Sequence, residues 1–405
     1  MVYDVIIVGG GAAGFFTAIN IVEKNKGLKV AILERGKEVL SKVRISGGGR
    51  CNVTHACFDP KELTQFYPRG SKELLGPFHQ FCSGDTIAWF DEHGVELKIE
   101  EDGRMFPTSD SSQTIIDCLL EAAKKAKIAI LTGHSVQEVF QKESSWKVDT
   151  NQGGMEAKYL VFTTGSNPKM WNLISELGHT VVEPVPSLFT FNIKDPRIKD
   201  LMGVSSLAEV SVRNSNLEAS GPLLITHWGM SGPGILRLSA WGARELFNKN
   251  YQFEILVNWL PGETTSSAME ILLGLKDEHA KKWVIKKSPF DFPNRLWERF
   301  VIAAGIDEEA KWADLNKKQL QSLAEQLTAA SFHVNGKSTF KEEFVTAGGV
   351  DLKEVNFKTM ESKVLPSVFF AGEVLNIDAI TGGFNFQNAW TTGFIAAREI
   401  ATRNE

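Results

Sequence analysis

The feature that most constrains the fold is a glycine-rich turn near the start of the chain. Residues 3–8 form a short apolar run typical of a buried parallel strand, and apolar residues recur at helical spacing from Gly11 to about Val22. Gly9, Gly11 and Gly14 form the pattern G-x-G-x-x-G between and within these segments. The first glycine permits a tight turn, the second lets backbone approach a pyrophosphate, and the third lets the helix lie close to the sheet. The pattern predicts a dinucleotide-binding strand, turn and helix.

The segment that follows supports this prediction. Residues 29–33 (KVAIL) read as a second apolar strand, and Glu34 ends it twenty residues after Gly14. A carboxylate there can accept hydrogen bonds from both hydroxyls of an adenosine ribose and would repel a 2′-phosphate. The alternative is a glycine-rich turn in a sheet protein that holds no ligand. Because the same motif serves NAD and FAD, the rest of the chain must separate these two cofactors.

Two distant stretches point to FAD. Residues 160–165 (LVFTTG) and 368–373 (VFFAGE) are apolar strands that end in Thr-Thr-Gly and Gly-Glu. Each is a common strand end when taken alone, but in this order they resemble the second and third nucleotide-contact motifs of two-dinucleotide-binding-domain flavoproteins. Residues 134–161 alternate as a β-meander, and the resemblance assigns the backbone of Val136 to the adenine.

Five further segments carry a closer resemblance. They are RISGGGRCNVT (44–54), GRMFP (103–107), THWGMSGPGIL (226–236), TAGGV (346–350) and AGEVLNIDAITGGFNFQNAWTTG (371–393). With them the chain resembles, nearly end to end, the aminoacetone oxidase family of flavoproteins, also labelled BaiN-like NAD(P)/FAD-dependent oxidoreductases. The resemblance implies an α/β fold: a Rossmann-type two-dinucleotide-binding-domain flavoprotein fold with an inserted β-barrel domain and a small helical domain.

The domain bounds follow from where the pattern changes. Short strands and helices of the expected insert read at 189–193, 208–212, 253–258, 266–273, 297–304 and 317–329. We therefore expect a discontinuous FAD-binding domain at 1–187 and 345–405, a substrate-side barrel at 188–262 and 330–344, and a helical subdomain at 263–329.

The loop at residues 46–52 (SGGGRCN) offers consecutive N–H groups, a guanidinium and an amide, which suit an anionic or heterocyclic ligand. By resemblance it borders the flavin, and the alternative is a flexible surface loop. Cys51 could be a redox partner or a covalent flavin anchor, but a small buried cysteine is the commoner role. The four cysteines show no CxxC spacing, so we expect no structural disulfide.

Residues 381–389 (TGGFNFQNA) lead into a helix that runs to about Ala401. The resemblance places the start of this helix beside the flavin pyrimidine edge, where its dipole would stabilise the negative charge of a reduced flavin near N1 and O2. The alternative is a close helix–sheet contact, which small residues also serve. The motifs and the resemblance together predict these cofactor-binding residues: Gly9, Gly11, Ala12, Ala13, Gly14, Glu34, Arg35, Lys42, Ser46, Gly47, Gly48, Gly49, Arg50, Cys51, Asn52, Val136, Thr164, Gly165, Gly372, Glu373, Asp378, Gly383, Phe384, Asn385, Gln387 and Ala389.

His227 is the candidate catalytic residue, because a neutral imidazole next to Trp228 could carry a proton over the flavin. The alternative is a hydrogen-bonded structural histidine. Ser231 is the expected N-cap of a helix with Pro233 in its first turn. No Ser-His-Asp arrangement, metal-ligand cluster or Walker motif appears, and no second G-x-G-x-x-G of dinucleotide type follows Gly165.

Charge and hydropathy bound the partners. The chain has 44 Lys and Arg against 49 Asp and Glu and a net charge of −5, so we expect neither nucleic acid nor a membrane as the main partner. The N-terminus shows no signal-peptide pattern, and no apolar run reaches the roughly 20 residues of a membrane span. The expected location is the cytoplasm.

We expect an FAD-dependent oxidoreductase that moves a hydride between a small organic substrate and flavin N5 and passes electrons to O₂ or another acceptor. One alternative is an NAD(P)H-dependent flavin reductase of activated C=C bonds, with NAD(P)H as a transient electron donor. A second is a flavin-dependent RNA-modifying or RNA-binding protein, against which the net charge argues. The sequence leaves the substrate and the oligomeric state open.

Overall fold

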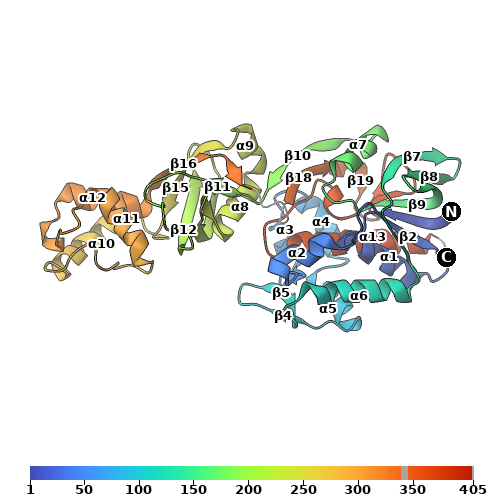
Figure 1. Ribbon diagram of the computed structural model, residues 1–405, viewed down its shortest axis with the longest axis horizontal. Helices are drawn as coiled ribbons and strands as arrows, with labels where there is room; N and C mark the ends of the chain where they lie inside the picture. Colours follow the sequence, from blue (N-terminus) through green and yellow to red (C-terminus); the bar gives the residue numbers. More distant parts are fainter. Residues whose placement is uncertain (339–344, 404–405) are drawn as a thin grey trace. The chain divides into compact units, whose positions relative to one another are not determined.

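The computed structural model describes residues 1–338 and 345–403 of the chain. The described residues form two compact units (Figure 1). Unit 1 contains residues 1–185 and 345–403, and unit 2 contains residues 186–338. The second unit is therefore an insertion in the sequence of the first.

A mostly parallel sheet forms the core of unit 1. Its strand order is β19-β20-β21-β9-β1-β2-β6, and the strands from β21 to β6 are parallel neighbours. Ile6 and Ile7 are fully buried, because helices or other strands cover both faces of the central strand, which explains the continuous apolar run. The strands are β1 (Val2–Val8), β2 (Val30–Glu34), β6 (Ala129–Thr132), β9 (Gly153–Phe162), β19 (Val355–Asn356), β20 (Glu361–Ser362) and β21 (Val368–Phe370). This is the predicted Rossmann-type α/β arrangement.

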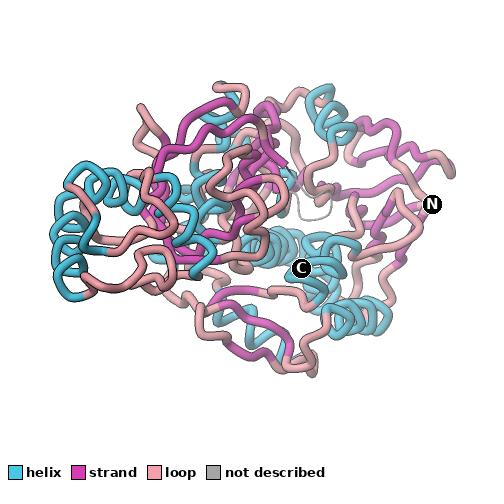
Figure 2. The backbone as a smooth tube through the Cα atoms, turned by 60° about the vertical axis from the view of Figure 1, so that its left-hand side comes forward, coloured by secondary structure: helices cyan, strands magenta, loops and turns pink. Residues whose placement is uncertain are grey.

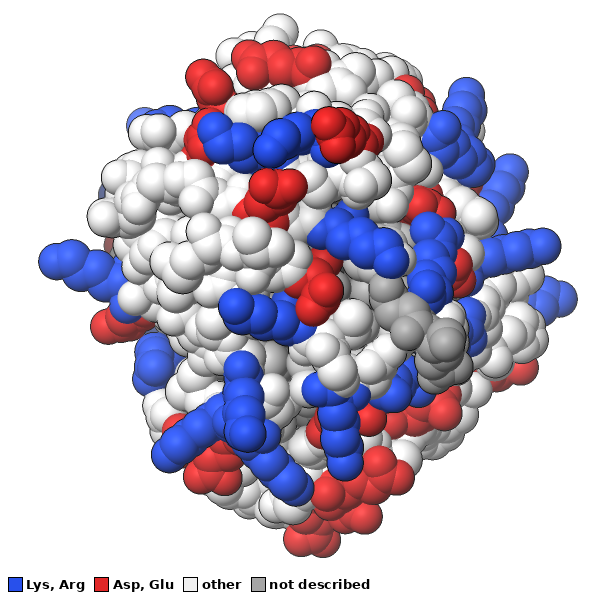
Figure 3. Space-filling model, turned by 90° about the vertical axis from the view of Figure 1, so that its right-hand side faces the viewer, with Lys and Arg blue, Asp and Glu red and all other residues white. Residues whose placement is uncertain are grey.

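The predicted meander lies beside this sheet, where β7 (Val136–Lys142) and β8 (Ser145–Thr150) pair antiparallel with each other and β8 pairs with β9. Figure 3 shows the face of the molecule that forms the right-hand side of Figure 1, and acidic and basic side chains are interspersed on it.

Two helices pack tightly in unit 1, α1 (Ala12–Lys24) and α13 (Phe384–Thr402). Gly393 of α13 makes this approach possible, since a Cβ there would lie 2.8 Å from Thr17 Oγ1 of α1. Helix α6 (Ser112–Lys125) also contacts α1 (Figure 1). Helix α1 thus packs on β1 and β2, and its contacts with α13 and α6 hold it in place.

The remaining elements of unit 1 are short. A small antiparallel sheet has the order β3-β5-β4, and β10 pairs with β18. These elements are α2 (Ser41–Gly49), β3 (Thr54–His55), α3 (Pro60–Thr64), α4 (Ser71–Phe78), α5 (Ser83–Glu92), β4 (Leu97–Ile99), β5 (Arg104–Pro107), α7 (Pro168–Glu176), β10 (Val181–Ser187), β18 (Val345–Val350) and the 3₁₀ turns η2 (Leu352–Glu354) and η3 (Gly372–Val374).

Unit 2 is built on one sheet of order β16-β15-β12-β13-β14-β11-β17. Its two end strands follow one another in the chain through Gly336, so the two edges of the sheet come together as in a barrel. The strands are β11 (Thr190–Asn192), β12 (Ser205–Val212), β13 (Glu218–Ile225), β14 (Gly229–Ser231), β15 (Gln252–Asn258), β16 (Ala330–Asn335) and β17 (Lys337–Ser338).

The helices of unit 2 fall into two groups along the chain, and Figure 2 shows them in cyan. Those between β15 and β16 enclose an apolar cluster that includes Trp297, Phe300 and Trp312. The helices are α8 (Pro233–Trp241), α9 (Ala243–Asn248), α10 (Thr265–Glu278), α11 (Asn294–Ala303) and α12 (Lys317–Thr328), with a 3₁₀ turn η1 (Trp312–Asp314).

The predicted N-cap of α8 is wrong. Ser231 ends strand β14, and the N-cap is Gly232, which makes no side-chain capping bond. The backbone reverses at Gly232 with φ +92°, and a Cβ there would lie 2.7 Å from the Pro222 carbonyl oxygen. Only glycine meets both conditions, whereas Pro233 occupies the first helical position as expected.

Candidate functional site

The candidate site lies at the carboxyl edge of the unit 1 sheet. Strands β21, β9, β1 and β2 are consecutive parallel neighbours, so their carboxyl ends meet at one edge. Gly9 follows β1, Thr163 follows β9 and Ala371 follows β21, while Glu34 ends β2. The three motifs predicted to contact a nucleotide, far apart in the sequence, are therefore adjacent in the fold.

The glycine turn is held by close backbone contacts. Gly9 has φ +118°, and a Cβ there would lie 2.5 Å from the Thr163 carbonyl oxygen. A Cβ on Gly14 would lie only 2.0 Å from the Gly9 carbonyl oxygen. Gly11 differs, since a Cβ there meets no heavy atom within 4 Å. Two glycines thus shape the turn, and the third leaves open space beside it.

The start of α1 opens onto this space. Gly11 is the N-cap and offers no side-chain oxygen, and no acidic residue occupies the first turn. The first N–H groups of a helix have no partner within it, and the helix dipole makes this end positive. Such an end binds the negative charge of a phosphate.

Glu34 is fixed next to the turn. One carboxylate oxygen accepts a hydrogen bond from the Gly10 N–H at 2.9 Å, and the other accepts one from the Gly36 N–H at 2.7 Å. Arg35 is exposed beyond it. Val136 is buried at the start of β7, where the strand register is irregular. The carboxylate and the turn are therefore tied together at the end of β2.

The loop at 46–52 leaves helical geometry at Ser46, and Gly47 and Gly48 adopt φ +58° and +67°. Cβ atoms on Gly48 and Gly49 would meet no heavy atom within 4 Å, so their backbone is accessible. Cys51 is fully buried, and burial raises its pKa to about 12. Its thiol therefore stays protonated at neutral pH, which favours the packing role over the redox role.

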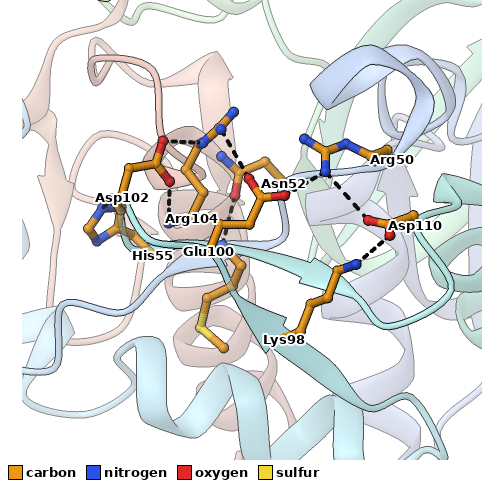
Figure 4. A network of polar contacts seen from close by, with 9 residues as sticks. Arg50, Asn52, His55, Lys98, Glu100, Asp102, Arg104 and Asp110 are labelled. Atoms are coloured by element: carbon orange, nitrogen blue, oxygen red, sulfur yellow. Dashed lines mark hydrogen bonds and ion pairs between the residues drawn. The ribbon is translucent and has the colours of Figure 1, made fainter.

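Arg50 is engaged by the chain itself (Figure 4). Its guanidinium lies 2.6 Å from Glu100 and 3.4 Å from Asp110, and it stacks 3.9 Å from the centre of the Phe106 ring. Asn52 accepts a hydrogen bond from the Met105 N–H at 3.3 Å. Both side chains therefore anchor the glycine loop onto the small sheet.

Behind the edge, Gly372 has φ +76°, and a Cβ there would lie 3.0 Å from the Ala13 Cβ. The neighbouring Glu373 pairs with Lys42 at 2.6 Å. Thr164 Oγ1 is buried and forms no hydrogen bond with any residue in the described part of the chain. Ala389 packs with Ala13 in the same small cluster, and Gly165 lies next to Glu373. An orphaned hydroxyl at this edge fits a group that the chain does not supply.

The start of α13 is anchored rather than open. Gly383 is its N-cap, and a Cβ there would lie 2.5 Å from the Thr54 carbonyl oxygen. Asn385 exchanges hydrogen bonds with the backbone of Ala379 at 3.0 and 3.1 Å, and Gln387 accepts from Thr54 at 2.5 Å. Asp378 is fully buried and pairs with Arg69. These side chains hold the backbone that the sequence assigned to the flavin.

Sequence reasoning missed Thr163 and His55. The Thr163 hydroxyl donates a hydrogen bond to the Gly9 carbonyl oxygen at 2.9 Å and so closes the glycine turn. His55 stacks on Phe384 at 4.6 Å, and its Nε2 lies 3.1 Å from the Asp102 carbonyl oxygen (Figure 4). Its buried Nδ1 has no partner among the described residues, and burial lowers its pKa. The Thr-Thr pair carried a signal for Thr163, whereas nothing in the local pattern marks His55.

His227 belongs to unit 2, where it lies exposed between β13 and β14. Its catalytic role stays a prediction. All four cysteines are free. Within residues 1–338 and 345–403, no group of three or more His, Cys, Asp and Glu side chains could hold a metal ion. Nor does any helix of that part have the length and apolar character to cross a membrane.

Known proteins match the chain along nearly its whole length. The family described as HI0933-like protein Rossmann domain matches residues 3–399. The chain is 27% identical to the ribosomal RNA dihydrouridine synthase of Escherichia coli over 416 residues, covering 98% of both chains. It is also 27% identical to the 3-dehydro-bile acid delta(4,6)-reductase of Clostridium scindens, again covering 98% of both.

A structural match agrees on the fold. The 3-ketosteroid-delta4-(5alpha)-dehydrogenase of Rhodococcus jostii superposes with a TM-score of 0.51 at 12% identity, covering 98% of this chain and 97% of that one. The predicted resemblance to BaiN-like oxidoreductases is confirmed by the family match and by the bile acid reductase. The chain belongs to the HI0933-like family and is a Rossmann-type flavoprotein oxidoreductase.

Proposed function

We propose that the protein is an FAD-dependent reductase that saturates a C=C bond conjugated to a carbonyl group, with NAD(P)H as the electron source. The observation that carries this proposal is that relatives with unrelated substrates are named for one type of reaction. Making dihydrouridine saturates the C5=C6 bond of uracil, which is conjugated to a carbonyl. A delta(4,6)-reductase of a 3-dehydro steroid acid acts on double bonds in conjugation with the 3-keto group.

The sheet edge fits FAD. The open space at Gly11 and the bare start of α1 suit the pyrophosphate, and the fixed Glu34 carboxylate suits the adenosine ribose. The orphaned Thr164 hydroxyl would gain a partner. We assign binding to the sequence-predicted set, with one division of labour inside it. Backbone and small residues contact the cofactor, while Arg50, Asn52, Asp378, Asn385 and Gln387 hold that backbone in place.

When bound, FAD supplies a hydride from N5 of its reduced ring. The protein residues orient and tune this chemistry. The start of α13 presents a positive dipole end, which favours the negative charge of a reduced ring. The protonated Cys51 adds no competing thiolate. Saturating a C=C bond also needs a proton on the second carbon, and His227 is our candidate to deliver it.

This proposal reverses the order of the two enzyme hypotheses from the sequence. The sequence favours hydride transfer from a small substrate to the flavin with O₂ or another acceptor, whereas the names of the relatives favour reduction. They also weaken the expectation that nucleic acid is not a partner, since one relative is named for ribosomal RNA. An enone and a uracil ring share the same conjugated C=C unit.

Anaerobic half-reactions test the proposal. Stopped-flow mixing of the holoprotein with NADPH or NADH is expected to bleach the flavin absorbance. Adding cyclohex-2-enone is then expected to restore it without O₂, and the saturated cyclohexanone serves as the control. Bleaching by small amines but not by NAD(P)H, with recovery only on admitting O₂, would contradict the proposal and revive the oxidase hypothesis.

The role of His227 is tested in the same experiment. His227→Gln removes the proton carrier from an exposed position. We expect it to slow reoxidation by the enone at least about tenfold, because general acid catalysis typically contributes 10²–10⁴-fold, while bleaching by NADPH keeps its rate. Equal rates in both half-reactions would exclude His227 as the proton donor.

A further inference from the structure

Unit 2 carries a cluster of lysines, bounded in the sequence by Glu278 and Asp291, that the proposed function does not use. It lies in the loop that joins α10 to α11 (Figure 1). Within residues 279–290 (HAKKWVIKKSPF) there are four lysines and no acidic residue. Lys281, Lys282, Lys286 and Lys287 are all exposed. We call residues 279–290 with Lys311 the basic loop.

An exposed indole stands in the middle of these charges. Trp283 keeps 42% of its surface exposed, as do Trp228 at 60% and Trp241 at 46% in the same unit, whereas Trp259, Trp297 and Trp312 are buried in its core. Among the three exposed indoles, Trp283 is the one that lies between two pairs of lysines in the sequence. The Lys311 ammonium lies 5.6 Å from the centre of its ring. None of the five lysines of the basic loop forms an ion pair with a carboxylate in the described part of the chain. Lys282 Nζ lies 3.1 Å from His279 Nδ1, so Lys281, Lys286 and Lys287 carry the charges that neither a carboxylate nor another described side chain contacts. The surface therefore offers lysines without a carboxylate partner beside an exposed indole.

The loop is held in a defined conformation. Trp283 and Lys311 form an antiparallel β-bridge, and the backbone N–H of Trp312 donates a hydrogen bond to the Lys282 carbonyl oxygen at 3.1 Å. Behind it, Val284 is fully buried, and the buried Trp297 donates its indole N–H to the Val284 carbonyl at 2.8 Å. Because the backbone of this loop is already ordered, binding a ligand at the exposed Trp283 would cost little conformational entropy.

From this geometry we propose that the basic loop binds single-stranded RNA, with lysines on the phosphates and Trp283 stacked on a base. Lysines tracking a phosphate backbone around an aromatic stacking platform are the two features by which proteins hold single strands without reading sequence. The inference extends the proposed function, since an RNA held here would carry uridines with the conjugated C=C unit. An acidic protein would satisfy the charges without needing a base-stacking surface, whereas an anionic membrane would take up both the lysines and the indole. The name of one relative, a ribosomal RNA dihydrouridine synthase, favours RNA, and binding to vesicles is the alternative outcome of the test.

Fluorescence anisotropy of a labelled twelve-nucleotide oligouridylate measures this binding with the full-length holoprotein across a range of KCl concentrations. We expect affinity to fall with salt, with a slope of about −0.7 per phosphate contact in a log–log plot. The double variants K281A/K282A and K286A/K287A are each expected to flatten that slope by up to about 1.4. Trp283→Ala is expected to weaken binding about tenfold and to leave the salt slope unchanged.

The matched control is K124A/K125A. Lys124 and Lys125 are also adjacent and exposed, at the end of α6 in unit 1, with the same change in net charge. If this control weakens binding as much as the loop variants, or if wild-type protein does not bind the oligouridylate, the inference fails. Lysine-dependent binding to phosphatidylserine vesicles without RNA binding would also overturn it. We expect the same variants to reduce the enone at the wild-type rate whether or not they bind RNA, so the two proposals can fail separately.

Discussion

At the residue scale, the glycines of the turn between β1 and α1 are needed for different reasons. The Gly9 carbonyl oxygen excludes every residue type except glycine at position 14, whereas a Cβ at position 11 would meet no heavy atom within 4 Å. The spacing alone predicted both roles, because tight packing and ligand approach recur at fixed positions of this motif. The hydroxyl of Thr163 that closes the turn follows strand β9, 154 residues along the chain, so the pattern at the turn itself does not show this contact.

These two glycines give a paired prediction. Alanine is favoured over glycine inside a helix by about 1 kcal/mol, but a Cβ 2.0 Å from a backbone oxygen forces the turn apart. We expect Gly14→Ala to lower the free energy of unfolding of the apoprotein by about 2–3 kcal/mol and to abolish FAD retention. Gly11→Ala is expected to leave apoprotein stability within about 0.5 kcal/mol and to weaken FAD binding. Denaturant unfolding and FAD titration measure both; equal losses of stability would contradict the assignment.

His179 gives a prediction about pH. It is buried at 3% exposure, and its Nε2 lies 2.7 Å from the Ser362 hydroxyl. Burial lowers its pKa, so below about pH 6.5 the unfolded chain binds the proton more readily than the fold does. The stability that neutral His179 provides is therefore complete above about pH 6.5 and is lost as the pH falls.

Denaturant unfolding of wild type and His179→Gln between pH 7.5 and pH 5.5 measures this loss. We expect the wild-type advantage in unfolding free energy to shrink on acidification. His79→Gln changes an exposed histidine and serves as the control for the loss of an imidazole at the surface. A wild-type advantage over His179→Gln that grew toward acid would refute the sign.

At the element scale, the sequence predicted the strands and the helix around the glycine motif, but it missed the short strands of the small sheet and also helix α6, which has 14 residues. The central strands and α1 show their period over many residues, and their predicted bounds agree with the structure to within about two residues. Strands β3, β4 and β5 span two to four residues each, too few for a period, and pairing across the chain defines them. The sequence therefore could not predict that the glycine loop is anchored on this small sheet.

Gln387 shows how α13 depends on those short elements. Its amide oxygen accepts from Thr54 of β3 at 2.5 Å and from Thr86 of α5 at 2.9 Å, and its NH₂ donates to Thr391 at 3.0 Å, all without solvent exposure. We expect Gln387→Met to lower the unfolding free energy by about 2–3 kcal/mol, because buried hydroxyls lose their acceptor. Gln321→Met, at an exposed position of α12, is the control and is expected to change it by less than about 0.5 kcal/mol. Similar effects at both positions would show that the polar cluster contributes nothing.

At the scale of the whole molecule, the parallel order of the strands made the position of the candidate site predictable. The net charge, which sums over the whole chain, did not reveal the basic loop. Strand ends that are hundreds of residues apart must share an edge once the strands are parallel neighbours, so three motifs sufficed to place the site. Net charge carries no such positional information. A chain of net charge −5 has both the interspersed charges of the face in Figure 3 and, near Trp283, lysines that form no ion pair with a carboxylate among the described residues.

The two-unit organisation predicts how cofactor removal changes unfolding. Every residue assigned to FAD lies in unit 1, whose sheet edge is assembled from both ends of the chain, whereas unit 2 has its own buried core. A ligand that binds only the folded state adds about 2.7 kcal/mol at a hundred times its Kd. Scanning calorimetry of apoprotein titrated with FAD is therefore expected to show two transitions, of which only one rises in temperature with FAD. The moving transition is expected to be the one that Gly14→Ala lowers, since that change lies in unit 1, and Trp297→Ala in the unit 2 core is expected to lower the other. A single transition that shifts as a whole would show that the two units unfold together and that FAD stabilises the entire chain.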